Sequence, residues 1–381
     1  MEPLKRTTDL AVPFVNLKAI HAPLEDVLIH EVADVIRSNQ FIMGPKVAAF
    51  ESDFAAMLNV GHAWGVSSGT DALVVALHAL EIGPGDEVIT TPYTFFATVE
   101  AILRVGAVPR FVDIEPETYN IDPALIESAV TEHTKAIVAV HLFGCSANMD
   151  AINAVARKHR LRVIEDAAQA VGAEWAGVRV GGLGDIGCFS FFPAKNLGAI
   201  GDGGAVTTKD SDLAERMRII RIHGSEKRYH HTVLGGNYRL DAIQAAVLRL
   251  KLPYLEQWTA ERQDAAFRYT EMLRGQGLEG QITLPVPGLG RHVFNQYVIR
   301  IHHGRRDEVF DELGKRDIGR AVYYPLPCHR QPLLTPHQVP DVRLPQADRA
   351  AAETLAIPIA PGITALQQEE VVDALLEILR S

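Results

Sequence analysis

The sequence has few of the features that mark secreted, membrane-bound or metal-binding proteins. Its 381 residues include only three cysteines, Cys145, Cys188 and Cys328, which are far apart and odd in number. That pattern supplies neither a disulfide framework nor a metal-ligand cluster, and it suits a reducing compartment. No apolar run approaches the roughly 20 residues of a membrane span, and no apolar segment typical of a signal peptide follows the N-terminus. We therefore expect a cytoplasmic protein without a metal site.

Positive charge is also scarce. The chain has 37 Lys and Arg against 47 Asp and Glu, which gives a net charge of −10. A surface that binds nucleic acid or an anionic membrane needs clustered basic residues, so we expect neither partner. The hydrophobic fraction of 47% and the charged fraction of 22% are those of an ordinary globular protein.

The order of apolar patterns predicts two unequal domains, since the chain is too long for one small core. From about residue 62 to 222, short β-branched runs alternate with helical patterns, such as a strand at 88–91 followed by a helix at 95–105 and a strand at 111–114. This alternation is typical of an α/β fold with a mostly parallel central sheet wrapped by helices. A helical pattern then runs from Asp241 to about Leu273, and a proline-rich segment with short strands follows. We expect a large α/β domain over residues 30–250 and a smaller C-terminal α+β domain over residues 251–381, with residues 1–29 packing on the smaller one.

One lysine, Lys195, occupies an apolar stretch of sequence in which burying its charge would be unfavourable. Lys195 follows the strand-like run Cys188-Phe189-Ser190-Phe191-Phe192 and is surrounded by apolar and small residues. A desolvated ammonium loses its proton more easily and becomes an amine nucleophile, as Schiff-base chemistry requires. The alternative is an exposed turn with the charge in water.

Three other strand ends carry groups that suit one ligand, because ligands of open α/β sheets bind outside the carboxyl ends of the strands. Ser68, Gly69 and Thr70 open a helix and form a candidate anion site, although Ser68 or Thr70 can simply cap the helix. Phe95 follows another strand, where an aromatic side chain could stack on a planar ring or be part of the core. Asp166 follows a third strand, where its carboxylate could pair with a ring nitrogen or cap a helix. A phosphate cradle, a ring platform, a carboxylate and an amine are the four things that pyridoxal 5'-phosphate needs.

A glycine-rich motif points to a different cofactor but lies in the wrong context. Gly182-Leu183-Gly184-Asp185-Ile186-Gly187 matches the dinucleotide fingerprint G-x-G-x-x-G. It precedes the aromatic strand instead of linking a strand to a helix, so we reject a dinucleotide site and interpret the segment as a flexible connection.

The ordered motifs resemble those of the DegT/StrS-type sugar aminotransferases, which are fold-type I pyridoxal-phosphate enzymes. The resemblance runs from about Pro13 to the C-terminus and is carried by Ser67-Ser68-Gly69-Thr70-Asp71-Ala72-Leu73, Thr94-Phe95-Phe96-Ala97-Thr98, Glu165-Asp166-Ala167-Ala168-Gln169-Ala170, Ser190-Phe191-Phe192-Pro193-Ala194-Lys195-Asn196-Leu197 and Gly235-Gly236-Asn237-Tyr238-Arg239-Leu240-Asp241.

This resemblance implies a role for each matched residue. Lys195 would form the Schiff base with the cofactor, and Asp166 would pair with its pyridine nitrogen. Gln169 would lie near the phenolic oxygen of the ring, and Phe95 would stack on it. The phosphate would be bound by Gly69, Thr70 and Ser190, with Asn237 reaching across from the neighbouring subunit, so that the sites are shared within a homodimer.

The resemblance also implies the reaction, a ping-pong transfer of an amino group from an amino acid, L-glutamate by analogy, to a nucleotide-linked keto sugar. Residues 322–331 are similar to a Tyr-Pro-x-Pro-x-His-x-Gln element of relatives that aminate C3 of a 3-keto sugar. Tyr324, His329 and Arg239 are the candidate substrate contacts; the alternative for each is a structural role.

Three other functions stay open at this stage. One is amination at C4 of a keto sugar, and another is dehydration of a sugar, although relatives that became dehydratases carry histidine in place of the lysine at 195. The third is a non-catalytic regulator that kept the fold, which predicts an eroded cofactor set. Lys195, Asp166, Gln169, Thr70 and Ser190 are all present.

Overall fold

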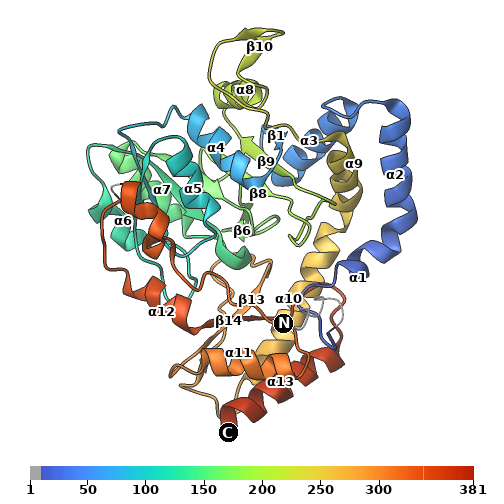
Figure 1. Ribbon diagram of the computed structural model, residues 1–381, viewed down its shortest axis with the longest axis vertical. Coiled ribbons are helices and arrows are strands. Elements are labelled where there is room, and N and C mark those ends of the chain that lie inside the picture. The colour runs from blue at the N-terminus through green and yellow to red at the C-terminus, as the bar shows by residue number, and fades with distance from the viewer. Residues whose placement is uncertain (1–9, 338) are drawn as a thin grey trace.

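A seven-stranded sheet forms the centre of the computed structural model, which describes residues 10–337 and 339–381 (Figure 1). The strand order is β1-β9-β8-β5-β4-β2-β3, and β9 is antiparallel to both of its neighbours while the pairs from β8 to β3 are parallel. The strands are β1 (His62–Val66), β2 (Glu87–Thr90), β3 (Val108–Phe111), β4 (Thr134–Val140), β5 (Arg162–Asp166), β8 (Ile186–Ser190) and β9 (Gly204–Thr208). The predicted α/β class with a mostly parallel sheet is confirmed.

Helices cover both faces of this sheet, which explains why its strands are apolar on both sides. One face packs against α4 (Gly69–Ala79), α5 (Ala97–Arg104) and α8 (Ser211–Ile220). The other face packs against α3 (Pro45–Leu58), α6 (Pro123–Ala129), α7 (Met149–His159) and α9 (Ala242–Lys251).

The C-terminal part is built on a three-stranded antiparallel sheet of β12 (Ile282–Thr283), β13 (Tyr297–Ile301) and β14 (Thr354–Ile357). The helix α10 (Leu255–Leu273) leads from the large sheet to this part and packs against α13 (Ala365–Arg380), while α11 (Arg306–Lys315) and α12 (Pro345–Glu353) complete it (Figure 1). No helix in residues 10–337 and 339–381 is long and apolar enough to cross a membrane.

The N-terminal segment contacts both parts. Val12 pairs with Ile318 and is buried in the C-terminal core. After α1 (Leu17–His21), the helix α2 (Glu25–Ser38) packs instead against α9. Residues 1–9 lie outside the described part, and the division of the chain into 30–250 and 251–381 stays a prediction. Two short antiparallel strand pairs remain: β6 (Glu174–Trp175) with β7 (Val178–Arg179), and β10 (Ser225–Lys227) with β11 (His230–His231).

Two local predictions are corrected. The strand expected at 111–114 ends at Phe111, and the Asp113 carboxylate beyond it accepts hydrogen bonds from the backbone N–H groups of Gln346 and Ala347 at the start of α12. The glycine-rich segment is not a flexible connection, since the backbone N–H groups of Leu183 and Gly184 each donate to the buried Glu165 carboxylate at 2.7 Å. This carboxylate fixes the loop.

Candidate active site

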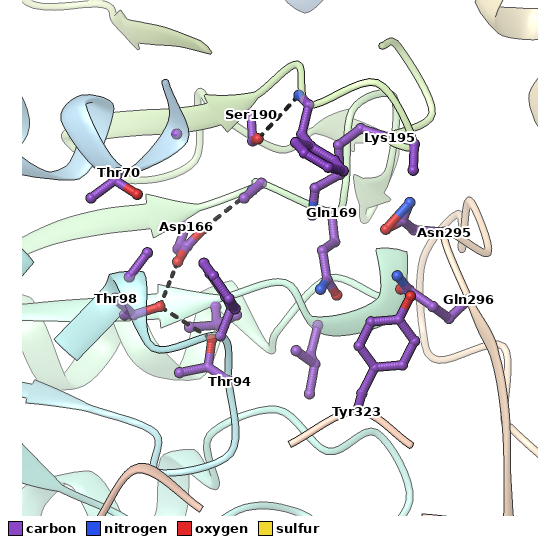
Figure 2. A pocket seen from close by; sticks show the side chains of 18 of the residues that line it. Thr70, Thr94, Thr98, Asp166, Gln169, Ser190, Lys195, Asn295, Gln296 and Tyr323 are labelled. Atoms are coloured by element: carbon purple, nitrogen blue, oxygen red, sulfur yellow. Dashed lines mark hydrogen bonds between the residues drawn. The ribbon is translucent and has the colours of Figure 1, made fainter. Parts of the chain in front are cut away.

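A cavity of about 480 Å³ opens at the carboxyl ends of the parallel strands. Its walls come from the segments after β1, β2, β4, β5 and β8, and the C-terminal part closes the opposite side (Figure 2). Nine of the predicted site residues line it: Ser68, Gly69, Thr70, Phe95, Asp166, Gln169, Ser190, Lys195 and Tyr324.

Lys195 lies on a tight turn after β8. Its backbone N–H donates to the Phe192 carbonyl oxygen, and a Cβ at Gly198 would stand 2.3 Å from the Pro193 oxygen, so only glycine fits that turn. Desolvation lowers the pKa of the Lys195 amine from its usual 10.5 to about 8, and the charge of Asp166 opposes this shift. Near neutral pH, part of this amine is therefore uncharged.

Asp166 is a buried carboxylate, 5% exposed, at the end of β5. The Thr98 hydroxyl donates to its Oδ2 at 2.7 Å, and the Ala168 N–H donates to its Oδ1 at 3.2 Å (Figure 2). Burial raises the pKa of this carboxyl group. It forms no ion pair with any residue that the structure describes, so a cationic ligand group in the cavity would supply the missing partner.

The N-terminus of α4 faces the same cavity. Ser68 caps the helix, with its Oγ accepting from the Asp71 N–H at 3.1 Å, so the capping alternative for Ser68 is realised. A Cβ at Gly69 would stand 2.7 Å from the Ser190 Cβ, which shows how closely the helix approaches the end of β8. The first-turn N–H groups, the helix dipole and the hydroxyls of Thr70 and Ser190 together suit a phosphate.

Gln169 joins two elements at the cavity. Its Oε1 accepts from the Phe143 N–H at 2.7 Å, and its Nε2 donates to the Tyr324 hydroxyl at 2.8 Å. Because that hydroxyl oxygen already accepts a hydrogen bond, its own proton is available to a ligand. Phe95, which is 63% exposed in the single chain, offers an open aromatic face in the cavity wall.

Three predicted residues lie elsewhere. Asn237 is exposed on the segment that follows the β10–β11 hairpin, and its backbone bridges to Ile222. Arg239 pairs through its backbone with Val66 at the edge of β1. His329 packs against the Phe111 ring at 6.3 Å, with its Nε2 3.3 Å from Asp348. None of these three lines the cavity of the single chain.

The structure adds four polar residues that motif analysis did not single out: Arg262, Asn295, Gln296 and Tyr323. In Figure 2, Asn295, Gln296 and Tyr323 lie across the cavity from Thr70 and Asp166. Arg262 sits within an amphipathic helix, where an arginine usually faces water, so the sequence holds no signal for its burial. Tyr323 lies next to Tyr324 within the element at residues 322–331, so the sequence did contain a signal for it.

Comparison with known proteins decides the family. A model of the DegT/DnrJ/EryC1/StrS aminotransferase family matches residues 24–376. The chain belongs to this family. As in other members, its fold is that of the fold-type I aminotransferases, and the chain is therefore an aminotransferase.

Relatives of this DegT-family chain match it along nearly their whole length. A pleiotropic regulatory protein of Geobacillus stearothermophilus is 47% identical, with 97% of this chain and 99% of the relative covered. The UDP-N-acetyl-3-dehydro-α-D-glucosamine 3-aminotransferase of Acidithiobacillus ferrooxidans is 45% identical, with 98% of both covered. The crystal structure of S. venezuelae DesV in complex with a ketimine intermediate superposes with a TM-score of 0.93 at 41% identity, covering 97% of this chain and 99% of the other.

Proposed function

We propose that this protein transfers the amino group of L-glutamate to C3 of a nucleotide-linked 3-keto sugar, with pyridoxal 5'-phosphate as cofactor and a ping-pong mechanism. The observation that carries the proposal is the shared cavity of Lys195, with its pKa lowered to about 8, and the unpaired buried carboxylate of Asp166. The completeness of this set favours catalysis over a regulator that only kept the fold.

The residues present fit the cofactor. When bound, pyridoxal 5'-phosphate supplies an aldehyde that condenses with amines and a ring that withdraws electrons from the carbon next to the nitrogen. The α4 N-terminus with Gly69, Thr70 and Ser190 would hold its phosphate, and Phe95 would cover its ring. Asp166 would face the ring nitrogen, and its carboxylate would favour a proton on that nitrogen.

Lys195 has two tasks in this proposal. Its Nζ would hold the cofactor, which requires the neutral amine that desolvation favours. The same Nζ, when it is free, would be the base that takes the proton from the α-carbon of the donor. The Tyr324 hydroxyl, oriented by Gln169, has its proton free for the cofactor or the sugar.

The choice of a 3-keto sugar rests on two supports. One is the element at residues 322–331, of which Tyr324 lines the cavity. The other is similarity to the Acidithiobacillus enzyme, whose name specifies a 3-amino transfer to a UDP-linked sugar. Amination at C4 is the alternative that a screen of keto sugars must include.

We further propose a cytoplasmic homodimer with shared active sites. The exposed Asn237, and Arg239 beside it, would then meet the cavity of the partner subunit, where the amide and the guanidinium suit a phosphate. His329 does not line the cavity of its own chain, and its contact with the substrate stays a prediction.

Absorbance between about 300 and 500 nm tests the proposal, since the lysine-bound cofactor absorbs there. The purified holoenzyme should show a visible band that L-glutamate converts to the shorter-wavelength amine form. Lys195→Ala should lack the conversion, whereas Lys209→Ala, which removes an exposed lysine, should behave as the wild type. Absence of any band after adding pyridoxal 5'-phosphate would refute the cofactor, and a band that ignores every amino acid would point to elimination chemistry.

A further inference from the structure

Two threonine hydroxyls form a hydrogen-bonded chain that ends on the Asp166 carboxylate. The Thr98 hydroxyl donates to Asp166 Oδ2 at 2.7 Å, and Thr94 Oγ1 lies 3.1 Å from Thr98 Oγ1 (Figure 2). A hydroxyl has one proton, and that of Thr98 is already donated to the carboxylate. Thr94 must therefore be the donor to Thr98, so both hydroxyl protons are directed toward Asp166.

Both threonines are buried, and their hydroxyls bond no backbone group in the described part of the chain. Thr94 is 3% exposed and Thr98 is 1% exposed. Thr98 lies in the first turn of α5, whose N-cap residue, Phe96, forms no side-chain capping hydrogen bond. A threonine inside a helix often bonds a carbonyl oxygen of the preceding turn, whereas this hydroxyl bonds Asp166 on β5. Helix capping therefore does not account for the two hydroxyls.

The Asp166 carboxylate is held by one hydrogen bond on each oxygen. Oδ2 accepts from Thr98, and Oδ1 accepts from the Ala168 N–H at 3.2 Å. Bonds on different oxygens fix the plane of the group, and each oxygen keeps a lone pair for a cationic ligand. Burial raises the pKa of this carboxyl group, and the Thr98 hydrogen bond opposes the rise because it stabilises the charged form.

We propose that Thr98, oriented by Thr94, is a positioning residue that keeps the Asp166 carboxylate ionised and turned toward the ring nitrogen of the cofactor; this inference rests on the proposed function. A neutral donor suits the task better than a cation. A lysine or arginine bonded to Asp166 would compete with a positively charged ring, whereas a hydroxyl stabilises the carboxylate and leaves its charge unpaired.

The first readout uses the full chain without cofactor, in which Asp166 titrates with no group bound. Infrared difference spectroscopy follows the C=O band of the protonated carboxyl, assigned by its loss in Asp166→Asn. Thr98→Val removes the hydroxyl and keeps the shape of the side chain. Its titration midpoint should lie about one pH unit above that of the wild type, because a hydrogen bond to a charged group favours the ionised form about tenfold. Thr98→Ser, which restores a hydroxyl, should recover most of this difference.

The variants leave the other titratable groups around Asp166 in place, so a difference between midpoints reports the hydroxyl. These groups are Lys195 after β8, Cys188 on β8, His141 after β4, the neighbouring Glu165, and Tyr324 of the C-terminal part. The matched control is Thr90→Val, which removes a buried hydroxyl that bonds the Val138 carbonyl oxygen and does not line the cavity. It should titrate as the wild type does.

The order of the chain gives a second readout. Thr94→Val should raise the Asp166 midpoint by less than Thr98→Val does. The double variant should match Thr98→Val alone, because Thr94 acts only through Thr98.

The holoenzyme gives a third readout, the loss of the cofactor band with L-glutamate. Thr98→Val should slow this reaction about 10-fold at saturating L-glutamate. The half-saturating concentration should stay the same, since the effect passes through Asp166 and not through contact with the amino acid.

Each outcome has one meaning. The inference is wrong if wild type and Thr98→Val share one Asp166 midpoint, or if the effects of the two valine substitutions add. If Thr98→Val does not fold, Thr94→Val decides, because it must move the same midpoint upward. A wild-type holoenzyme that responds to no amino acid would instead refute the proposed function, while the titration of the cofactor-free chain would still report on Thr98.

Discussion

The reactivity of Lys195 depends on two opposing effects on one pKa. Desolvation lowers the pKa to about 8, and the negative charge of Asp166 raises it. A lysine in water has its pKa near 10.5 and is almost wholly protonated at pH 8. The neutral fraction of Lys195 should therefore rise as pH rises through about 8, more than two units earlier than for a solvated lysine.

This pKa predicts the pH dependence of cofactor uptake. The rate at which cofactor-free protein forms its absorbance band with pyridoxal 5'-phosphate should rise between about pH 7 and 9 and then level off, since only the neutral amine attacks the aldehyde. Stopped-flow absorbance at a series of pH values measures it, with Lys195→Ala as the blank. A rate that keeps rising beyond about pH 10 would mean that the amine is solvated.

Single residues were predictable where a strand end fixed their surroundings. Asp166 ends one strand of the parallel sheet and Lys195 follows another, and the rule for open sheets brings such positions to one edge. Arg262 was not predictable, because its burial arises from contacts with the loop at 294–295 and with Ile359, which are distant in the chain. No local pattern records such contacts.

At the scale of elements, the site depends on how closely α4 approaches β8. A Cβ at Gly69 would stand 2.7 Å from the Ser190 Cβ and 3.3 Å from its Cα, so one of the two elements must shift. Gly69→Ala should therefore displace the helix N-terminus and weaken cofactor binding by about 10-fold or more, because a phosphate there depends on aligned N–H groups. Absorbance titration of the cofactor-free protein with pyridoxal 5'-phosphate gives the dissociation constant.

Gly61→Ala is the matched control for this prediction. A Cβ at Gly61, just before β1, would meet its nearest neighbour, the Lys209 oxygen, at 3.7 Å, an ordinary contact. Its cofactor affinity should equal that of the wild type. Unchanged affinity in Gly69→Ala would show that the α4 N-terminus is not the phosphate cradle.

Elements were predictable in kind and less so in their ends. The helix after Asp122 begins at Pro123 as the capping pattern indicates, since the Asp122 carboxylate accepts from the Ala124 N–H. The strand predicted at 111–114 lies at 108–111 in the structure. The prediction was wrong because apolar residues continue after the chain has left the sheet. The Asp113 carboxylate instead accepts hydrogen bonds from the first turn of α12, more than 200 residues later in the chain. Only the tertiary structure shows this contact.

At the scale of the whole molecule, the single chain leaves Asn237 and Arg239 away from its own cavity. The β10–β11 hairpin projects from the molecule (Figure 1). The apolar residues Tyr229, in its turn, and Leu234, just after it, are 79% and 80% exposed and precede Asn237 in the chain. Large apolar side chains in water favour burial against a partner. In the proposed homodimer, a second copy of the chain covers this segment, and Asn237 serves the active site of that copy.

Mixed dimers test this arrangement directly. Lys195→Ala removes the amine of a site, and Asn237→Ala removes the group that the proposed dimer lends to the neighbouring site. In a mixed dimer, one site would combine the intact Lys195 of one subunit with the intact Asn237 of the other, and the second site would lack both.

Co-refolding the two variants in equal amounts should therefore restore about a quarter of wild-type activity, since half of the dimers are mixed and each has one intact site of two. Activity is read as the loss of the cofactor band with L-glutamate and its return when a keto sugar accepts the amino group, with each variant alone as the control. If the mixture is no more active than the average of its two components, Asn237 does not serve a partner's site, and the segment after the β10–β11 hairpin has another purpose.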